Sequence, residues 1–212
     1  MLNFIAKQIH EVILKANNIL LIPHQNPDGD ALGSSTAFGV WLGHIEKDFT
    51  IFCKTPHTPR FSYLPLEKFT TDPAIWEKSF DVVIVFDSGD LRYAGVSEEI
   101  ARVRDRIVLI DIDHHATNEF FGDLNFVDTK ASSTSEMVQR FFLSIILASK
   151  KKLPMDCSLV LLQTPTILPM LRLRHLPSLP SVNCCVVVDE WMQFRIVSTK
   201  IFRFRPSKYG EK

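Results

Sequence analysis

Apolar residues follow two kinds of pattern in the first two thirds of the chain. One is a helical period, in which apolar side chains recur every three or four positions, and the other is a short unbroken run typical of a buried strand. Helical periods cover residues 3–17, 30–43 and 133–147, and the predicted strands cover 19–22, 50–53, 81–86 and 106–112. Short apolar strands that alternate with helices predict an α/β fold with a mostly parallel sheet flanked by helices. Ligands of such sheets gather at the carboxyl ends of the strands, so the polar residues found there are candidates for a site.

The pattern changes after Ala148. Residues 148–212 contain six prolines and one glycine, and no helical or strand period lasts for more than a few positions. We therefore predict an ordered domain over residues 1–147 and an irregular tail over residues 148–212. The tail has 11 basic and 4 acidic residues, whereas residues 1–147 have 13 and 20, so a neutral chain joins two parts of opposite charge. A basic tail is typical of nucleic-acid binding, which is one interpretation of this segment.

Several classes of protein are not indicated by the composition. Lys7, His10 and Glu11 interrupt any apolar run near the N-terminus, so no secretory signal is predicted there. No stretch of the chain approaches the roughly 18 consecutive apolar residues of a membrane-spanning helix. The four cysteines lack the paired spacing that would predict a zinc site or a disulfide framework. We therefore expect a cytoplasmic protein that has no membrane partner.

The first polar cluster comes directly after the earliest predicted strand. It contains His24, Asp28 and Asp30 within seven residues, on a turn made by Pro27 and Gly29. An imidazole and two carboxylates that converge on one point suit Mn²⁺, Zn²⁺ or Fe²⁺ better than Ca²⁺, which prefers oxygen ligands alone. The alternative is a turn in which Asp28 or Asp30 caps the next helix. For this segment by itself the two interpretations have similar weight.

Two more clusters follow later strands. Asp87 comes directly after the third predicted strand, where an aspartate by itself is most often a helix cap. Asp113, His114 and His115 follow the fourth strand. An aspartate followed by two histidines at a third strand end is difficult to explain by chance. Such a group suits a metal site, because one imidazole can bind the metal while a neighbouring carboxylate orients a ring. Together the three strand-end clusters favour a two-metal hydrolase, in which paired divalent ions activate water and stabilise the leaving oxygen.

These segments resemble a known family. The sequences HQNPDGDALGS at 24–34 and DHHATN at 113–118, with the strand end at Asp87 between them, resemble the first three motifs of the DHH phosphoesterase superfamily. The segment ASSTSEM at 131–137 also resembles the family. The similarity covers roughly residues 15–140 and is greatest to the nanoRNase/pAp-phosphatase branch, whose members are relatives of the RecJ exonuclease.

The resemblance implies a site for two divalent ions, with Mn²⁺ as the metal. Asp113 would support this site, and His115 would face the scissile phosphate. The family activity would be hydrolysis of short oligoribonucleotides from an end, or dephosphorylation of 3′-phosphoadenosine 5′-phosphate (pAp), and the family suggests a homodimer. The implied ligands are His24, Asp28 and Asp87 for one ion, and Asp30, Asp87 and His114 for the other, with Asp87 bridging the two.

Two alternatives to this activity remain open. A pyrophosphatase or exopolyphosphatase has the same chemistry and shares the first three motifs. A non-catalytic remnant that at most binds metal belongs to a different class. Hydrolysis of pAp, dinucleotides and pyrophosphate, measured side by side with Mn²⁺, separates these possibilities.

The resemblance does not continue through the tail. The family has a fourth motif, typically Thr-Asp-Thr-Gly, whose aspartate completes the second metal, and then a small domain that binds the substrate. Asp156 and Asp189 have different neighbours, so the tail as written contains neither feature. We therefore expect little or no turnover by this chain, and its substrate-binding residues stay unassigned.

The genetic code offers a reason for the change in sequence pattern after Ala148. When codons for the tail are read from their third base, Met155, Asp156 and Cys157 force Gly-Leu, and the codons up to Pro165 permit Leu-Thr-Gly-Ile-Leu-Thr-Asp-Thr. Matches of this kind continue to Lys212, and they occur in the same order as the corresponding segments of the family. We therefore predict that residues 148–212 are an out-of-frame translation, with the slip near the lysine run at 150–152.

Overall fold

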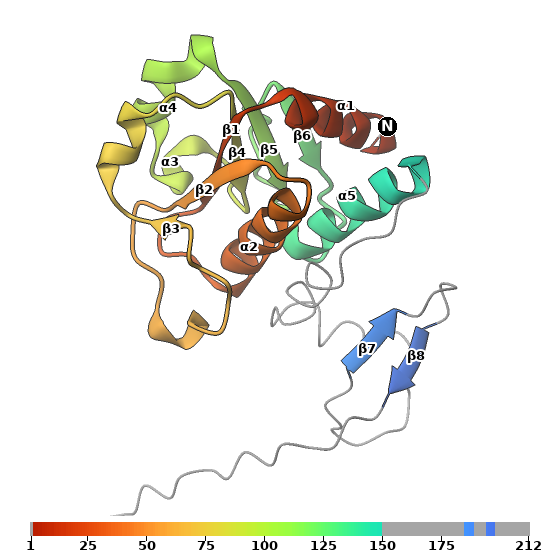
Figure 1. The fold of residues 1–212 in the computed structure, drawn as a ribbon. Coiled ribbons are helices and arrows are strands. Elements are labelled where there is room, and N and C mark those ends of the chain that lie inside the picture. The colour runs from red at the N-terminus through yellow and green to blue at the C-terminus, as the bar shows by residue number, and fades with distance from the viewer. Residues whose placement is uncertain (1, 150–184, 189–193, 198–212) are drawn as a thin grey trace, which may run out of the picture. The chain divides into compact units, whose positions relative to one another are not determined.

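The structure is a computed structural model that describes residues 2–149, 185–188 and 194–197. The chain forms two compact units, Met1–Leu171 and Arg172–Lys212. Helices and strands alternate along the first unit (Figure 1). Its helices are α1 (Leu2–Lys15), α2 (Gly29–His44), α3 (Leu91–Ala94), α4 (Ser97–Val103) and α5 (Thr134–Ser149), with 3-10 turns η1 (Pro59–Phe61), η2 (Pro73–Glu77) and η3 (Arg104–Arg106). Its strands are β1 (Asn18–Pro23), β2 (Asp48–Phe52), β3 (Phe69–Thr70), β4 (Val82–Phe86), β5 (Val108–Asp113) and β6 (Leu124–Val127).

The six strands form one sheet in the order β3-β2-β1-β4-β5-β6, and every neighbouring pair is parallel. The chain first builds outward from β1 to β3 and then returns to add β4 on the other side of β1. The strand order therefore reverses between β1 and β4, and a crevice at such a reversal is where open α/β sheets bind their ligands. The predicted α/β fold with a parallel sheet flanked by helices is confirmed.

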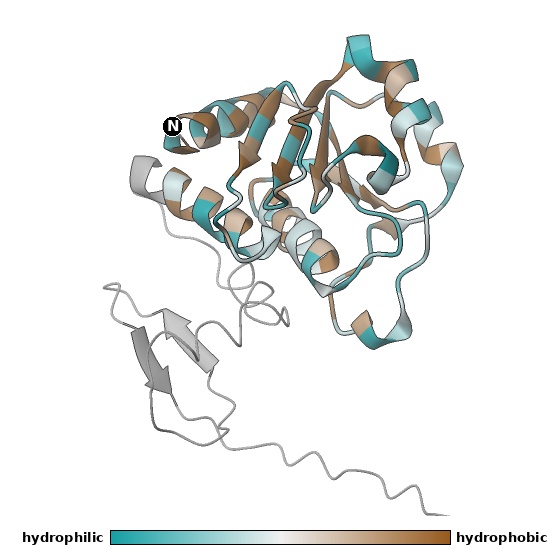
Figure 2. Ribbon diagram, turned by 180° about the vertical axis from the view of Figure 1, so that it is seen from behind, coloured by the Kyte–Doolittle hydropathy of each residue, from teal (hydrophilic) through white to brown (hydrophobic). Residues whose placement is uncertain are grey.

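Helices cover both faces of this sheet. One hydrophobic cluster packs α1, α2 and α5 against one face, and a smaller cluster packs α3 and α4 against the other. Successive residues of β1 alternate between them, since Ile19 and Leu21 belong to the first cluster and Leu20 and Ile22 to the second. Figure 2 accordingly shows the central strands as mostly hydrophobic. Burial on both faces explains why these strands are unbroken apolar runs.

An aromatic cluster holds α2 and α5 on the sheet. Phe38 of α2 is fully buried, and its ring centroid lies 5.4 Å from that of Phe86 at the end of β4. The same ring lies 5.2 Å from Phe141 and 6.0 Å from Phe142, both on α5. Aromatic contacts of this kind add to the free energy of burial. The cluster therefore fixes the start of α5 relative to the carboxyl end of β4, which matters for the site.

Several elements were not predicted from the sequence. β3 has two residues, and β6 is a four-residue edge strand whose buried side chain is Phe126. α3 and α4 have four and seven residues, too few for a helical period to be recognised. The predicted helices and strands that were identified agree with the observed bounds to within about two residues, a usual uncertainty for element ends.

In the second unit, β7 (Cys185–Val188) and β8 (Phe194–Val197) form an antiparallel pair. These strands lie within the segment for which we predict an irregular tail, and their β-branched valines suit a strand. Helix α5 extends through Ala148 and Ser149, two residues beyond the predicted start of the tail. The other residues of the predicted tail, including the predicted slip near 150–152, lie outside the described residues. No helix among the described residues is long and apolar enough to cross a bilayer.

Candidate metal centre

The carboxyl ends of the three central strands carry the candidate ligands in one row. Pro23 at the end of β1 pairs with Phe86 of β4, which in turn pairs with the next-to-last residue of β5. Continuing this register by one residue brings His24, Asp87 and Asp113 side by side. Since β1 and β4 flank the reversal in strand order, His24 and Asp87 face each other where a ligand crevice is expected.

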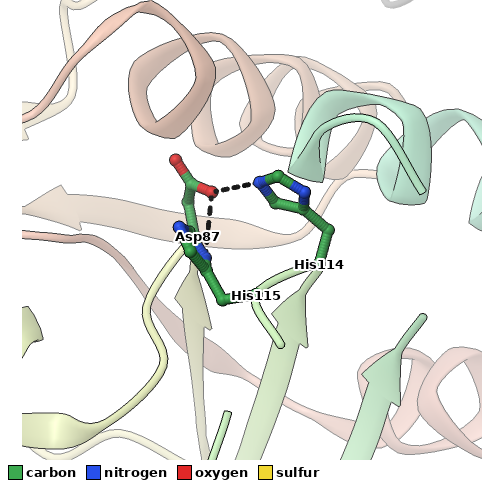
Figure 3. A group of neighbouring side chains, drawn as sticks. All are labelled: Asp87, His114 and His115. Atoms are coloured by element: carbon green, nitrogen blue, oxygen red, sulfur yellow. Dashed lines mark ion pairs between the residues drawn. The ribbon is translucent and has the colours of Figure 1, made fainter. Parts of the chain in front are cut away.

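Asp87 lies at the middle of this cluster. Its Oδ2 is 3.6 Å from Nε2 of His24, whereas its Oδ1 is 3.6 Å from Nε2 of His114 and 3.8 Å from Nδ1 of His115. Figure 3 shows the two histidines of the third motif converging on this carboxylate. Asp87 also has a left-handed backbone conformation, with φ of 58°, which is uncommon for a residue other than glycine. Its two oxygens thus face two different groups of potential ligands.

Two of the three histidines present the same ring nitrogen to the carboxylates. Nδ1 of His24 is 2.8 Å from the carbonyl oxygen of Gln25, and Nδ1 of His114 is 3.3 Å from that of Ala131. A carbonyl oxygen only accepts hydrogen bonds, so each Nδ1 carries the proton that it donates. Each Nε2 is therefore left with a free lone pair directed at Asp87, the arrangement usual for a metal-binding imidazole.

The start of α5 holds the carboxylates from the other side. The backbone N–H groups of Thr134 and Ser135 donate to Oδ2 and Oδ1 of Asp30, each at 2.8 Å. The hydroxyl of Thr134 donates to Oδ1 of Asp87 at 2.7 Å. Nε2 of His114 lies 3.9 Å from Oδ2 of Asp30. The two backbone N–H groups at the start of α5 thus hold the Asp30 carboxylate in one orientation.

Asp28 caps a helix and also lies beside a histidine of the cluster. As the N-cap of α2, its Oδ1 accepts hydrogen bonds from the N–H groups of Asp30 and Ala31 at 2.8 and 3.1 Å. The same oxygen lies 3.9 Å from Nε2 of His24. The predicted cap is therefore confirmed at Asp28, and the cap places this carboxylate beside the histidine. After β4, by contrast, the helix cap is Asp90, which leaves Asp87 free for the centre.

His115 has a different partner from the other two histidines. Its Nδ1 lies 2.7 Å from Oδ1 of Asp113, a carboxylate that is fully buried. Oδ2 of Asp113 accepts a hydrogen bond from the side-chain amide of Asn118, also at 2.7 Å. This chain fixes the orientation of the His115 ring and keeps its Nδ1 as the donor. Nε2 of His115 is left for another partner, and the side chain is 40% exposed.

The donor set fits divalent cations. Among the described residues, two groups could hold an ion with one atom from each residue: His24, Asp28 and Asp87, and Asp87, His114 and His115. Burial and the neighbouring charge of Asp30 raise the pKa of Asp87 well above its usual range, although the hydrogen bond from Thr134 opposes this. A buried carboxylate beside other carboxylates gains from a positive charge, which a metal ion would supply.

Asp111 is another buried carboxylate next to this cluster. Both of its oxygens are buried, and this burial raises the pKa of Asp111 to about 8, although the side chain of Asn118 opposes the rise. It precedes Asp113 by two residues on β5, so the two side chains lie on the same face of the sheet. Burial thus favours the neutral form of this carboxyl group.

The outer rim of the centre contains an exposed aromatic side chain. The ring of Tyr93 on α3 lies against the ring of His24, with 4.9 Å between centroids. Burial and the charges of Asp87 and Asp28 raise the pKa of the Tyr93 hydroxyl. Tyr93 is nevertheless 49% exposed, so part of its surface is available beside the centre.

All seven residues predicted as ligands or catalytic groups lie in this one region. The grouping differs in one respect from the implied ligand sets, since His115 lies within ligand distance of Asp87 and His114 while the Asp30 oxygens are directed at α5. Sequence reasoning missed Thr134, Asn118 and Tyr93 as individual residues. The first two lie in segments that resemble the family, whereas no sequence signal identifies Tyr93.

Comparisons with known proteins identify relatives of part of this chain. A bifunctional oligoribonuclease and PAP phosphatase NrnA from Thermus thermophilus is 34% identical over 130 residues, which cover 60% of this chain and 37% of that protein. A protein of the same name from Bacillus subtilis is 32% identical over 134 residues, covering 60% of this chain and 38% of the relative. The chain thus spans about two fifths of the length of these relatives.

A solved structure shares the fold. An exopolyphosphatase-related protein from Bacteroides fragilis superposes with a TM-score of 0.61 at 24% identity, over 66% of this chain and 43% of that one. The model of the DHH family, N-terminal domain, matches residues 18–163, a segment that contains every residue of the centre. This match covers more than half of the length of the chain, and the chain therefore belongs to the DHH family.

Proposed function

We propose that this chain is a metal-dependent phosphoesterase that binds two divalent ions, with Mn²⁺ as the metal. The proposal is carried by Asp87, whose two carboxylate oxygens face separate groups of ligands. One ion would be held by His24, Asp28 and Asp87. The other would be held by Asp30, Asp87 and His114. In both sets the imidazole directs Nε2 toward the carboxylates, so this nitrogen is available to an ion bound between them. Paired ions, when bound, supply Lewis-acid activation of water and of the phosphate group.

His115 is the proposed proton donor to the leaving oxygen. Its Nδ1 hydrogen bond to Asp113 leaves Nε2 as the atom that can carry and release a proton toward the substrate. Asp113 holds the ring in this orientation, while Asn118 keeps Asp113 in place. The ring nitrogen of His115 nearest to Asp87 is this same Nδ1, and because it donates a hydrogen bond to Asp113 it has no free lone pair for an ion bound at Asp87.

The proposed substrates are short oligoribonucleotides and pAp. The support is the similarity to proteins named oligoribonuclease and PAP phosphatase, combined with the centre described above. The exopolyphosphatase-related neighbour favours the alternative, an enzyme for inorganic polyphosphate or pyrophosphate. A homodimer and a cytoplasmic location remain predictions.

The test is Mn²⁺-dependent hydrolysis of pAp, a ribodinucleotide and inorganic pyrophosphate by the whole chain, measured side by side. We expect pAp and the dinucleotide to be preferred, with slow turnover because the tail lacks the fourth motif. Faster hydrolysis of pyrophosphate would favour the alternative. Mn²⁺ titration by electron paramagnetic resonance runs in parallel, and a chain that binds no Mn²⁺ would overturn the proposal.

A further inference from the structure

Tyr93 occupies a position that the metal centre does not account for. Among the described residues it is the only phenyl or indole ring that lies against one of the proposed ligands, His24. It is also about half exposed. A single exposed aromatic residue on a protein surface is ordinary, but one beside a polar site offers a flat apolar surface to whatever binds there.

The backbone of Tyr93 is fixed on both sides. Its N–H donates to Oδ1 of Asp90 at 2.7 Å, and its carbonyl oxygen accepts from the N–H of Gln25 at 3.4 Å. The helix then ends at Gly95, whose φ of 77° allows the chain to turn away. A side chain at Gly95 would come within 3.1 Å of Cβ of Lys54, so α3 lies close against the segment after β2. An exposed ring on a fixed backbone loses little conformational entropy when it binds a ligand.

The surroundings of the ring decide what it would bind. The charged side chains of the centre that act on the ring are the carboxylates of Asp87 and Asp28, which repel a phosphate group unless metal ions are present. The aromatic face of the ring adds nothing to the binding of inorganic phosphate, which has no planar group to stack on it. A nucleobase, however, stacks on an aromatic side chain whatever its identity.

We propose that Tyr93 is the stacking platform for the nucleobase next to the phosphate held at the metal centre. This inference rests on the proposed phosphoesterase function and narrows it to nucleotide substrates. The ring lies against His24, so a base stacked on it is within one nucleoside of a phosphate bound at the centre. The platform requires no particular base, which suits an enzyme that acts on short RNA of any sequence.

The experiment compares two products of pAp hydrolysis, AMP and inorganic phosphate, as ligands of the whole chain saturated with Mn²⁺. Isothermal titration calorimetry gives both affinities for the wild type and for Tyr93→Leu, Tyr93→Phe and Tyr63→Leu. Tyr93→Phe keeps the ring and removes only the hydroxyl group. Tyr63 is the matched control, since it is 51% exposed and has no ring contact with the described residues of the centre.

We expect Tyr93→Leu to lower the ratio of AMP affinity to phosphate affinity by about tenfold, the loss typical of one base–aromatic stack. Tyr93→Phe and Tyr63→Leu should keep the wild-type ratio. An unchanged ratio in Tyr93→Leu would overturn the proposal. So would an equal fall in both affinities together with a weaker Mn²⁺ affinity, because Tyr93 would then act by supporting His24.

The same titrations separate this proposal from the function on which it rests. A wild-type chain that binds phosphate but not AMP would overturn the platform and leave a metal-dependent phosphoesterase in place. A wild-type chain that binds neither ligand with Mn²⁺ would overturn both. Circular dichroism of each variant shows whether the fold is retained, and Tyr93→Phe provides the comparison if Tyr93→Leu is unstable.

Discussion

The hydroxyl of Thr134 donates a 2.7 Å hydrogen bond to Oδ1 of Asp87, although the two residues are 47 positions apart. Both side chains are buried. The contact joins the first turn of α5 to the strand end at the middle of the metal centre. Thr134 is therefore a positioning residue for the carboxylate that would bridge the two ions.

Replacing Thr134 should weaken metal binding without removing a ligand. Thr134→Val has almost the same shape but leaves Oδ1 of Asp87 without its donor, so we expect Mn²⁺ affinity to fall by about 10- to 100-fold. Thr134→Ser keeps the hydroxyl and should stay near the wild type. Calorimetric titration with Mn²⁺ measures both, and equal affinities for the two variants would contradict a positioning role.

The roles of the two adjacent histidines can be separated by counting bound ions. His114→Ala should lose one of two Mn²⁺ ions, because Nε2 of His114 faces both Asp87 and Asp30. His115→Ala should retain two ions, because its Nδ1 is engaged by Asp113. Electron paramagnetic resonance of unbound Mn²⁺ gives the stoichiometry. Loss of an ion in His115→Ala would instead assign this residue to the ligands.

The aromatic cluster under the centre should dominate the stability of the first unit. Phe38→Ala leaves a cavity between α2, α5 and β4, and we expect it to lower the free energy of unfolding by about 3–5 kcal/mol. Phe4→Ala is the control, since Phe4 is 66% exposed, and its effect should stay within about 0.5 kcal/mol. Urea unfolding followed by circular dichroism measures both. Similar losses for the two variants would contradict the proposed packing.

Asp81 should make the stability dependent on pH. Hydrogen bonds from the backbone N–H groups of Asn18 and Asn17, at 3.0 and 2.6 Å, lower the pKa of Asp81 below its ordinary value. A carboxyl group whose pKa is lower in the folded state adds stability above its unfolded pKa of about 3.9, and this is lost as the pH falls through the folded value.

The variant Asp81→Asn resembles the protonated carboxyl group and tests this dependence. At pH 7 it should be less stable than the wild type, and the difference should shrink once the pH is below about 4. Urea unfolding of both proteins at pH 7 and pH 3 gives the comparison. A difference that is the same at both values would show that the charge of Asp81 has no part in it.

The reading frame of the tail can be tested on the gene itself. We expect an A-rich run at the codons for Lys150–Lys152, and downstream codons that spell Gly-Leu across Met155 to Cys157 in the alternative frame. Sequencing of genomic DNA across this run measures it directly. Restoring the frame should also supply the fourth motif and raise turnover of pAp. Downstream codons unrelated to the family would contradict the hypothesis.

Much of the fold could be predicted because its signals are local. The apolar runs of β1, β4 and β5 specify strands buried on both faces, and the helical periods specify α1, α2 and α5. The short elements α3 and β6 could not be predicted, because four residues complete neither a helical period nor a recognisable alternation. The candidate ligands could also be identified from the sequence, since His24, Asp87 and His114 each come directly after a strand.

What the sequence by itself determined is the central strands β1, β4 and β5 and the polar residues that follow them. Only the tertiary structure decided that β1 lies beside β4, so that His24 meets the carboxylate of Asp87. The structure also decided that α5 brings Thr134 to the same carboxylate and that α3 brings Tyr93 to His24. These contacts join segments that are far apart in the chain. They result from the packing of helices on both faces of a sheet, and no local sequence pattern specifies that packing.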